Sequence, residues 1–237
     1  MNAITPEILA LGVIWYIVFL FSTTCHEAAH ALAAKLGGDP TAFLGGQVTL
    51  NPMPHIQREP FGMVVAPIAT YFLSHWVVGW ASAPYDPAWQ RRYPRRAAWM
   101  ALAGPGANFA LMLLAGAGIR AGMAFGVFHA PETASFTKIT EATNPAMWGF
   151  AATLLSVLFM ENLLLGTFNL LPVPPLDGSS GVTLLMSERA ALKFSEFLEE
   201  PVFRMAGLVA AWYAYDKVFR FFFVAALNAL YPGASHG

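Results

Sequence analysis

Charged side chains are scarce in this sequence, and their scarcity excludes an ordinary soluble domain. Of the 237 residues, 11% are Asp, Glu, Lys or Arg, whereas soluble domains carry about a quarter. Hydrophobic residues make up 57%, and the mean hydropathy is +0.52. This is too little charge to cover a water-exposed surface, so we expect a polytopic membrane protein that contacts the lipid bilayer.

Two further absences narrow the class of protein. The chain has 13 basic and 14 acidic side chains, which gives a net charge of −1. No broad positive field is therefore expected, and this argues against nucleic acid as a partner. Cys25 is the single cysteine, so the chain cannot form an intrachain disulfide or a disulfide-stapled scaffold.

The neutral stretches between charged residues predict an all-α polytopic membrane protein with about five membrane segments. We interpret the whole chain, 1–237, as a single domain. Its expected elements are a helix over 6–37, a strand or loop region over 39–57, a re-entrant or hairpin segment over 60–85, a helix over 95–127, a helix over 146–171 followed by an unwound stretch over 172–178, a surface helix over 180–199 and a helix over 201–231.

Region 39–57 is where the sequence suggests β structure. Two glycines precede the alternating run QVTL at 47–50, and the turn-forming pair Asn51-Pro52 follows it. Alternation bounded by turn residues favours a small β hairpin directly after the first helix.

The motif HEAAH at 26–30 places three polar side chains at the end of the first apolar stretch. On a helix, His26 and His30 share one face with Cβ atoms about 6 Å apart, so both imidazoles can reach one zinc ion. Glu27 lies beside them and can accept a proton from a zinc-bound water. Polar groups inside a membrane helix cost free energy, which disfavours two merely structural histidines beside an acid.

A catalytic zinc site also needs a third protein ligand and an open position. In NLLPVPPLDG at 169–178, three prolines in four positions unwind the backbone just before Asp177. The break can direct this carboxylate inward, and an ordinary turn acid at a helix end is the alternative. The other candidates are acids and histidines near membrane segments: Glu161, His55, His75, His129 and Asp216.

Together these motifs resemble the site-2 protease family of intramembrane zinc metalloproteases. HEAAH and NLLPVPPLDG carry the resemblance, and TLNPMPH at 49–55 and ALAGPGAN at 101–108 extend it over nearly the whole chain. The sequence is most similar to the short prokaryotic members without a PDZ or CBS domain. The resemblance implies one zinc ion per chain, bound by His26, His30 and Asp177, with Glu27 as the general base.

Three further residues are candidates for substrate binding. By the resemblance, Asn108 and Asn169 hydrogen-bond the substrate or the backbone of the active site. His55 follows the expected hairpin, which could guide an extended substrate by strand addition, and ordinary polar surface is the alternative for this histidine.

Glu161 departs from the apolar character of its surroundings, MENLLLGTFN at 160–169. We favour a packed carboxyl that is protonated or paired with a polar neighbour. The alternatives are a contact with a zinc-bound histidine and a rival metal ligand.

The three metal ligands constrain the topology. Each lies toward the C-terminal part of its segment, so the two segments must cross the membrane in the same direction. One of the two apolar segments between them should therefore not cross fully, and 60–85, with Pro67 near its centre, is the candidate. The arginines at 91–96 place their loop in the cytoplasm. We therefore expect an outside N-terminus, an active site toward the cytoplasmic side of the cell membrane, and positions 40 and 90 on the same membrane face.

The expected function is zinc-dependent hydrolysis of peptide bonds in or near transmembrane segments of membrane protein substrates, a reaction suited to regulated proteolysis. The alternative is a membrane metal transporter or metal-binding scaffold in which HEAAH is only a cation site. Replacing Glu27 by Gln separates the two, because a protease should keep zinc and lose cleavage.

Overall fold

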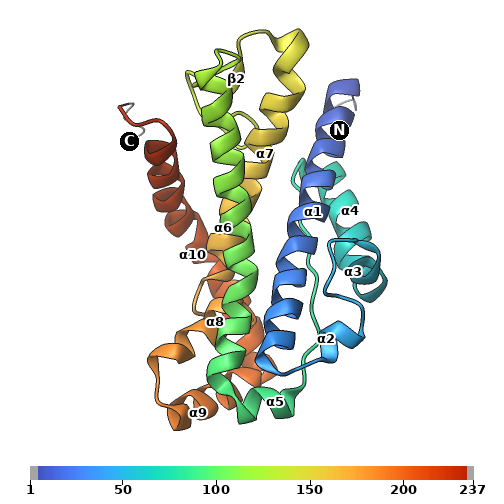
Figure 1. Ribbon diagram of the computed structural model, residues 1–237, viewed down its shortest axis with the longest axis vertical. Coiled ribbons are helices and arrows are strands. Elements are labelled where there is room, and N and C mark those ends of the chain that lie inside the picture. The colour runs from blue at the N-terminus through green and yellow to red at the C-terminus, as the bar shows by residue number, and fades with distance from the viewer. Residues whose placement is uncertain (1–4, 234–237) are drawn as a thin grey trace.

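A computed structural model describes residues 5–233 of the chain, and these residues are mostly helical (Figure 1). The expected domain, 1–237, extends at both ends beyond the described residues. Among the residues described, three helices are long and apolar enough to cross a membrane: α1 (Pro6–Gly37), α6 (Pro94–Ala124) and α7 (Pro145–Asn169). The other two of the five expected membrane segments stay predictions.

Local signals set the ends of α1. The Thr5 hydroxyl accepts a hydrogen bond from the backbone N–H of Ile8, and Pro6 occupies the first turn, where no backbone N–H is needed. Gly38 follows the helix with a φ of 99°, a left-handed conformation that favours glycine and ends helices. The resulting 32-residue helix is about 48 Å long, more than a bilayer core requires.

α6 packs against both α1 and α7 and runs antiparallel to them, so α1 and α7 descend in the same direction (Figure 1). This is the direction that the three predicted metal ligands require. Small buried residues on α6, such as Ala97, Ala101 and Gly104, let the neighbouring helices approach closely. The apolar core between α6, α7 and α10 includes Ile119 and Met160.

The prediction of a β hairpin over 39–57 is wrong. This region forms two short helices, α2 (Thr41–Leu44) and α3 (Met53–Arg58), joined by turns. The alternating run is only four residues long, and even a longer two-stranded hairpin is only marginally stable when it is isolated. Asn51 forms a turn just before α3 instead, because its side-chain oxygen accepts a hydrogen bond from the backbone N–H of Met53.

The two-stranded antiparallel sheet lies elsewhere in the chain. It pairs β1 (Phe128–His129) with β2 (Glu141–Ala142) in the connection between α6 and α7. The sheet therefore closes the end of the bundle away from α5 and α9 (Figure 1).

Segment 60–85 forms a helix followed by an extended return. A π-helical turn, η1 (Phe61–Val65), continues into α4 (Ala66–Ser74), and the chain then runs extended to α5 (Pro87–Arg92). The apolar helix 61–74 is too short to qualify as a membrane span. Its position within a bilayer stays a prediction.

The chain after α7 turns back sharply before its last helices. An irregular stretch containing a cis Pro174-Pro175 bond leads to α8 (Asp177–Gly181) and the 3-10 turn η2 (Val182–Leu185). The helices α9 (Glu188–Glu199) and α10 (Pro201–Leu230) follow. α10 is long but carries charged residues in its second half, and it is not among the three helices that qualify as spans.

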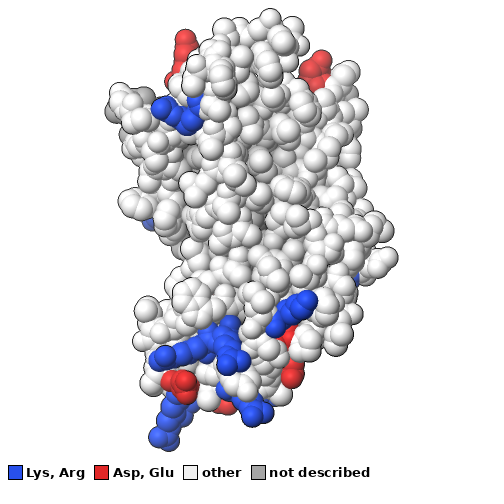
Figure 2. Space-filling view, in the orientation of Figure 1, with Lys and Arg blue, Asp and Glu red and all other residues white. Residues whose placement is uncertain are grey.

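Charged side chains lie mainly toward the two ends of the molecule's long axis. Lys and Arg gather at the end where α5 and α9 lie, while a broad band across the middle of the face in Figure 2 carries almost no charge. The basic residues of α5, the first turn of α6 and α9 are Arg91, Arg92, Arg95, Arg96, Arg189 and Lys193. An uncharged band between charged ends is the surface expected of a protein that crosses a bilayer.

Candidate metal centre

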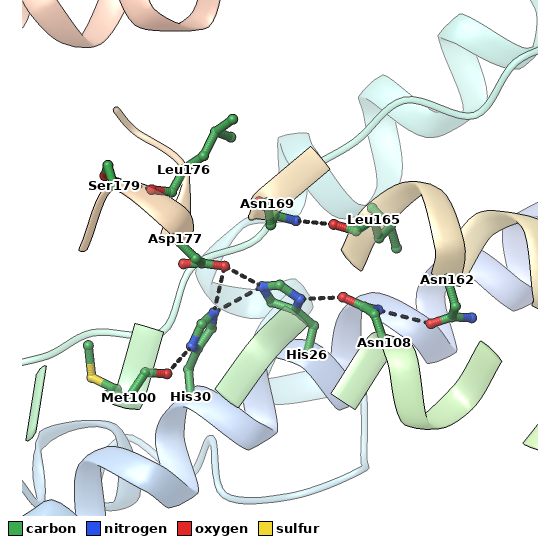
Figure 3. A network of polar contacts seen from close by, with 10 residues as sticks. All are labelled: His26, His30, Met100, Asn108, Asn162, Leu165, Asn169, Leu176, Asp177 and Ser179. Carbon is green, nitrogen blue, oxygen red and sulfur yellow. Dashed lines mark hydrogen bonds and ion pairs between the residues drawn. The ribbon is translucent and has the colours of Figure 1, made fainter. Parts of the chain in front are cut away.

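The two histidines of HEAAH project from α1 toward the start of α8. Both are buried, and their Nε2 atoms lie 2.9 Å apart because residues four apart stack on one helix face. Their rings meet edge to face, with centroids 4.6 Å apart. The pair therefore presents two ring nitrogens to a single point (Figure 3).

Asp177, the first residue of α8, completes a three-atom cluster with the histidines. Its Oδ2 atom lies 3.2 Å from Nε2 of His26 and 3.3 Å from Nε2 of His30. The proline run ends α7 and allows the chain to turn back. Gly178 is needed for that turn, because a Cβ at this position would overlap the backbone carbonyl of Leu170.

The second ring nitrogen of each histidine faces a hydrogen-bond acceptor. Nδ1 of His30 donates to the backbone carbonyl of Met100 at 2.8 Å, and Nδ1 of His26 donates to Oδ1 of Asn108 at 2.6 Å (Figure 3). A neutral imidazole carries one ring hydrogen. Because both hydrogens are used on the Nδ1 side, the two Nε2 atoms face the cluster as lone pairs.

The geometry of the cluster fits a zinc ion. Three electron-pair donors, two imidazole nitrogens and a carboxylate oxygen, meet within 3.3 Å, an arrangement that a cation stabilises. A tetrahedral zinc site with bonds of about 2.0–2.1 Å separates its ligand atoms by about 3.3–3.4 Å. The observed separations of 2.9, 3.2 and 3.3 Å are close to that spacing.

Gly104 on α6 leaves room for the imidazoles of His26 and His30. A Cβ at this position would overlap Nε2 of both His26 and His30. The sequence run ALAGPGAN contained this residue, but only the packing of α6 against α1 shows that its missing side chain faces the metal-binding atoms. Gly104 is thus a functional residue that the sequence analysis missed.

The other predicted site residues lie in three different environments. Glu27 is buried on α1 beside the ligands, with 5% of its surface exposed. Asn108 is fully buried, and its amide contacts His26 and Asn162. Asn169, the last residue of α7, is partly buried at the edge of the cluster, where its amide donates to the carbonyl of Leu165 (Figure 3).

His55 is not brought into the cluster. It is buried in α3, where its Nε2 atom lies 3.2 Å from the backbone carbonyl of Thr49. This contact closes the turn that precedes α3. Its role in substrate binding stays a prediction.

The rival candidates for third ligand also lie outside the three-residue cluster. Glu161 is buried on α7, as the sequence favoured, and its Oε2 atom has no hydrogen-bond partner among the described residues. His75 ends α4, His129 lies in β1, and Asp216 is exposed on α10. Among the described residues, the group assembled to hold a metal ion is His26, His30 and Asp177.

Comparisons with known proteins agree with this chemistry. The family model described as "Peptidase family M50" matches residues 14–212. The chain is 29% identical over 191 residues to the Bacillus subtilis (strain 168) protein named "Putative zinc metalloprotease YwhC", with 77% of each chain covered. No solved structure matches the chain.

Proposed function

The chain belongs to peptidase family M50, and from this membership we propose that it is a zinc-dependent endopeptidase that cuts other membrane proteins in or near their transmembrane segments. One zinc ion per chain would be held by His26, His30 and Asp177. The observation that carries the proposal is the convergence of these three side chains between helices that are apolar enough to cross a membrane.

The proposed chemistry divides the work between the metal and Glu27. Zinc, when bound, lowers the pKa of a water and polarises a carbonyl. Glu27 would accept the proton of the attacking water and then donate it to the leaving amine. Its burial beside His26 removes competing bulk water, which strengthens the electrostatic interactions of its carboxylate.

Substrate binding requires an unwound segment, because the carbonyl groups of a membrane helix are occupied by internal hydrogen bonds. Of the three predicted substrate residues, Asn169 is partly accessible at the edge of the cluster, and we propose that it contacts the substrate. Asn108 and His55 are buried. We therefore propose that Asn108 orients His26 and that His55 acts by holding the turn before α3.

The proposed orientation places the active site near the cytoplasmic face of the cell membrane. Lys and Arg are concentrated at the end of the bundle that includes α5 and α9, and positive residues favour the cytoplasm. His30 precedes the end of α1 by seven residues, or about 10 Å along the helix axis. The metal centre would therefore lie inside the bilayer, within reach of cytoplasmic water.

Replacing Glu27 by Gln tests the proposed reaction. The purified protein is reconstituted in vesicles with a fluorescent single-span reporter whose membrane segment contains helix-destabilising glycines. We expect Glu27→Gln to retain one zinc per chain while its cleavage rate falls about a hundredfold or more. The exposed Glu132→Gln, the matched control, should cleave like the wild type. Cleavage by Glu27→Gln at the wild-type rate would contradict the role of Glu27.

Replacing Asp177 by Ala tests the third ligand independently of cleavage. The variant should lose most of its bound zinc, because only two protein ligands remain. Metal analysis of the purified wild type and variant measures this directly. An unchanged zinc content would contradict the ligand assignment.

A further inference from the structure

The two metal-facing histidines are oriented by acceptors of different kinds. His30 donates to a backbone carbonyl, that of Met100, which can only accept a hydrogen bond. His26 donates to the side-chain amide of Asn108, which has both an oxygen and an NH₂ group. A rotation of this amide by 180° would present a donor to His26 and favour the wrong ring tautomer. The orientation of Asn108 must therefore be fixed by something else.

Asn162 of α7 is the residue that contacts the other end of the Asn108 amide. Nδ2 of Asn108 donates to Oδ1 of Asn162 at 2.9 Å. Nδ2 of Asn162 in turn donates to the backbone carbonyl of Leu158 at 2.9 Å and to the hydroxyl of Ser22 at 2.8 Å. Asn108, Asn162 and Ser22 are all fully buried, so water does not compete for these groups.

The Leu158 carbonyl sets the direction of each hydrogen bond in the series that leads through Asn162 and Asn108 to His26. Because that oxygen only accepts, the NH₂ group of Asn162 must face it, and the oxygen of Asn162 must face Asn108. The NH₂ group of Asn108 then faces Asn162, which leaves its oxygen for His26. Nδ1 of His26 is therefore the protonated nitrogen, and Nε2 keeps its lone pair toward the metal site.

We propose that Asn162 is a positioning residue for the metal centre. It touches neither substrate nor metal, and it acts through Asn108 by fixing which end of that amide faces His26. The inference rests on the proposed function only in taking His26, His30 and Asp177 as the zinc site. Because the chain of contacts joins α1, α6 and α7, the tautomer of a metal ligand depends on the packing of all three helices.

Zinc affinity in Asn162→Leu, measured by competition with a chelator, tests the proposal. Leu has a similar volume and cannot hydrogen-bond, and removal of such outer partners weakens metal binding about 10- to 100-fold. We expect a loss of at least about tenfold. The matched control is Thr167→Val on the same helix, because the buried Thr167 hydroxyl bonds Leu163 and Tyr215 without any link to His26. Its zinc affinity should stay within about twofold of the wild type.

Two further variants separate positioning from packing. In an Asn108→Leu background, Asn162→Leu should cause no additional loss of zinc affinity, because its effect passes through Asn108. Asn162→Asp should keep zinc affinity within a few-fold of the wild type, because a carboxyl oxygen still accepts from Nδ2 of Asn108. If Asn162 served packing alone, Asn162→Asp should lower zinc affinity more than Asn162→Leu does. The reason is that a buried acid beside the Leu158 carbonyl disturbs packing more than Leu does.

The ring tautomer of His26 provides an independent readout by ¹⁵N NMR of histidine-labelled protein. The wild type should show a protonated Nδ1, and Asn162→Leu should show a mixture of tautomers. Unchanged zinc affinity in Asn162→Leu, or additive losses in the double variant, would overturn the proposal. A wild type that binds zinc normally but cuts no reporter would instead contradict the proposed function and leave this inference standing.

Discussion

Gly104 shows how a single missing side chain can define a metal site. The position directly faces the Nε2 atoms of His26 and His30, and no other residue type leaves that space open. Pro105, which follows it, removes a backbone hydrogen bond inside α6 at the same level. At the scale of the residue, the placement of the two imidazoles therefore depends on α6 as well as on α1.

Gly104→Ala is expected to weaken zinc binding at least about tenfold, because its methyl group displaces the metal-facing imidazoles. Chelator competition on the purified protein measures the effect. The control is Gly106→Ala, two residues further along α6, where a Cβ meets no atom within 4 Å. That change should leave zinc affinity intact and can raise helix stability by up to about 1 kcal/mol. Equal zinc affinity in the two variants would contradict the role assigned to Gly104.

At the scale of the element, Asp39 ties the end of α1 to the start of α5. Its buried carboxylate accepts hydrogen bonds from the backbone N–H groups of Thr41 at 2.9 Å and of Asp86 at 2.8 Å. Burial alone would raise the pKa of this carboxyl, but the hydrogen bonds from Thr41 and Asp86 outweigh burial and lower the pKa below its usual value. The extended return after α4 is thus fixed to α1 by a charged group.

Asp39→Asn should destabilise the fold by about 2 kcal/mol at pH 7, because an amide cannot accept both hydrogen bonds. The charged form stabilises the protein above its unfolded pKa of about 3.9, and that contribution is lost as the pH falls through the lower pKa of the folded state. Thermal unfolding in detergent should show a lower melting temperature for Asp39→Asn than for the wild type, and this difference should shrink below about pH 4.

The control for this substitution is Asp86→Asn, since Asn caps a helix as well as Asp and the backbone N–H of residue 86 remains. The thermal stability of Asp86→Asn should match that of the wild type both at pH 7 and below about pH 4. A pH-independent difference between Asp39→Asn and the wild type would argue against the charged hydrogen bonds.

At the scale of the whole molecule, the course of the chain explains how α1, which bears two ligands, and α7, which leads to the third, run in parallel. α1 and α7 run in the same direction with α6 packed antiparallel against both, and 61–86 rises beside α1 as a short helix before it returns in an extended run to α5 (Figure 1). The basic residues of α5 and α9 gather at the end of the bundle where these two helices lie. The arrangement predicts a cytoplasmic location for both ends of segment 61–86.

Thiol labelling of intact cells can test this orientation in a Cys25→Ser background. Leu44→Cys and Arg92→Cys, both at exposed positions, should react with an impermeant reagent only after the membrane is opened. Thr133→Cys, at the exposed opposite end between α6 and α7, should react in intact cells. Labelling of positions 44 and 92 from opposite faces would mean that segment 61–86 crosses the bilayer fully.

The sequence by itself determined the features that depend on local spacing. Four-residue spacing on a helix places His26 and His30 together in any fold, and low charge with long apolar runs requires a membrane environment. The alternating run at 47–50 misled because short strands depend on partners, whereas local hydrogen bonds such as that of Asn51 form regardless. The proline run before Asp177 indicated this residue as a candidate ligand. That its carboxylate lies next to the histidines could not be predicted from the sequence.

Only the tertiary structure decided which groups of α6 and α7 surround and orient the two histidines. The roles of Gly104, the Met100 carbonyl and Asn162 depend on the rotation and depth of one helix against another, and no local pattern specifies these. The physical reason is that helix packing in a membrane follows close contact between small residues along the entire interface. The geometry of a metal site whose ligands come from α1 and α8 therefore depends on the packing of the whole bundle.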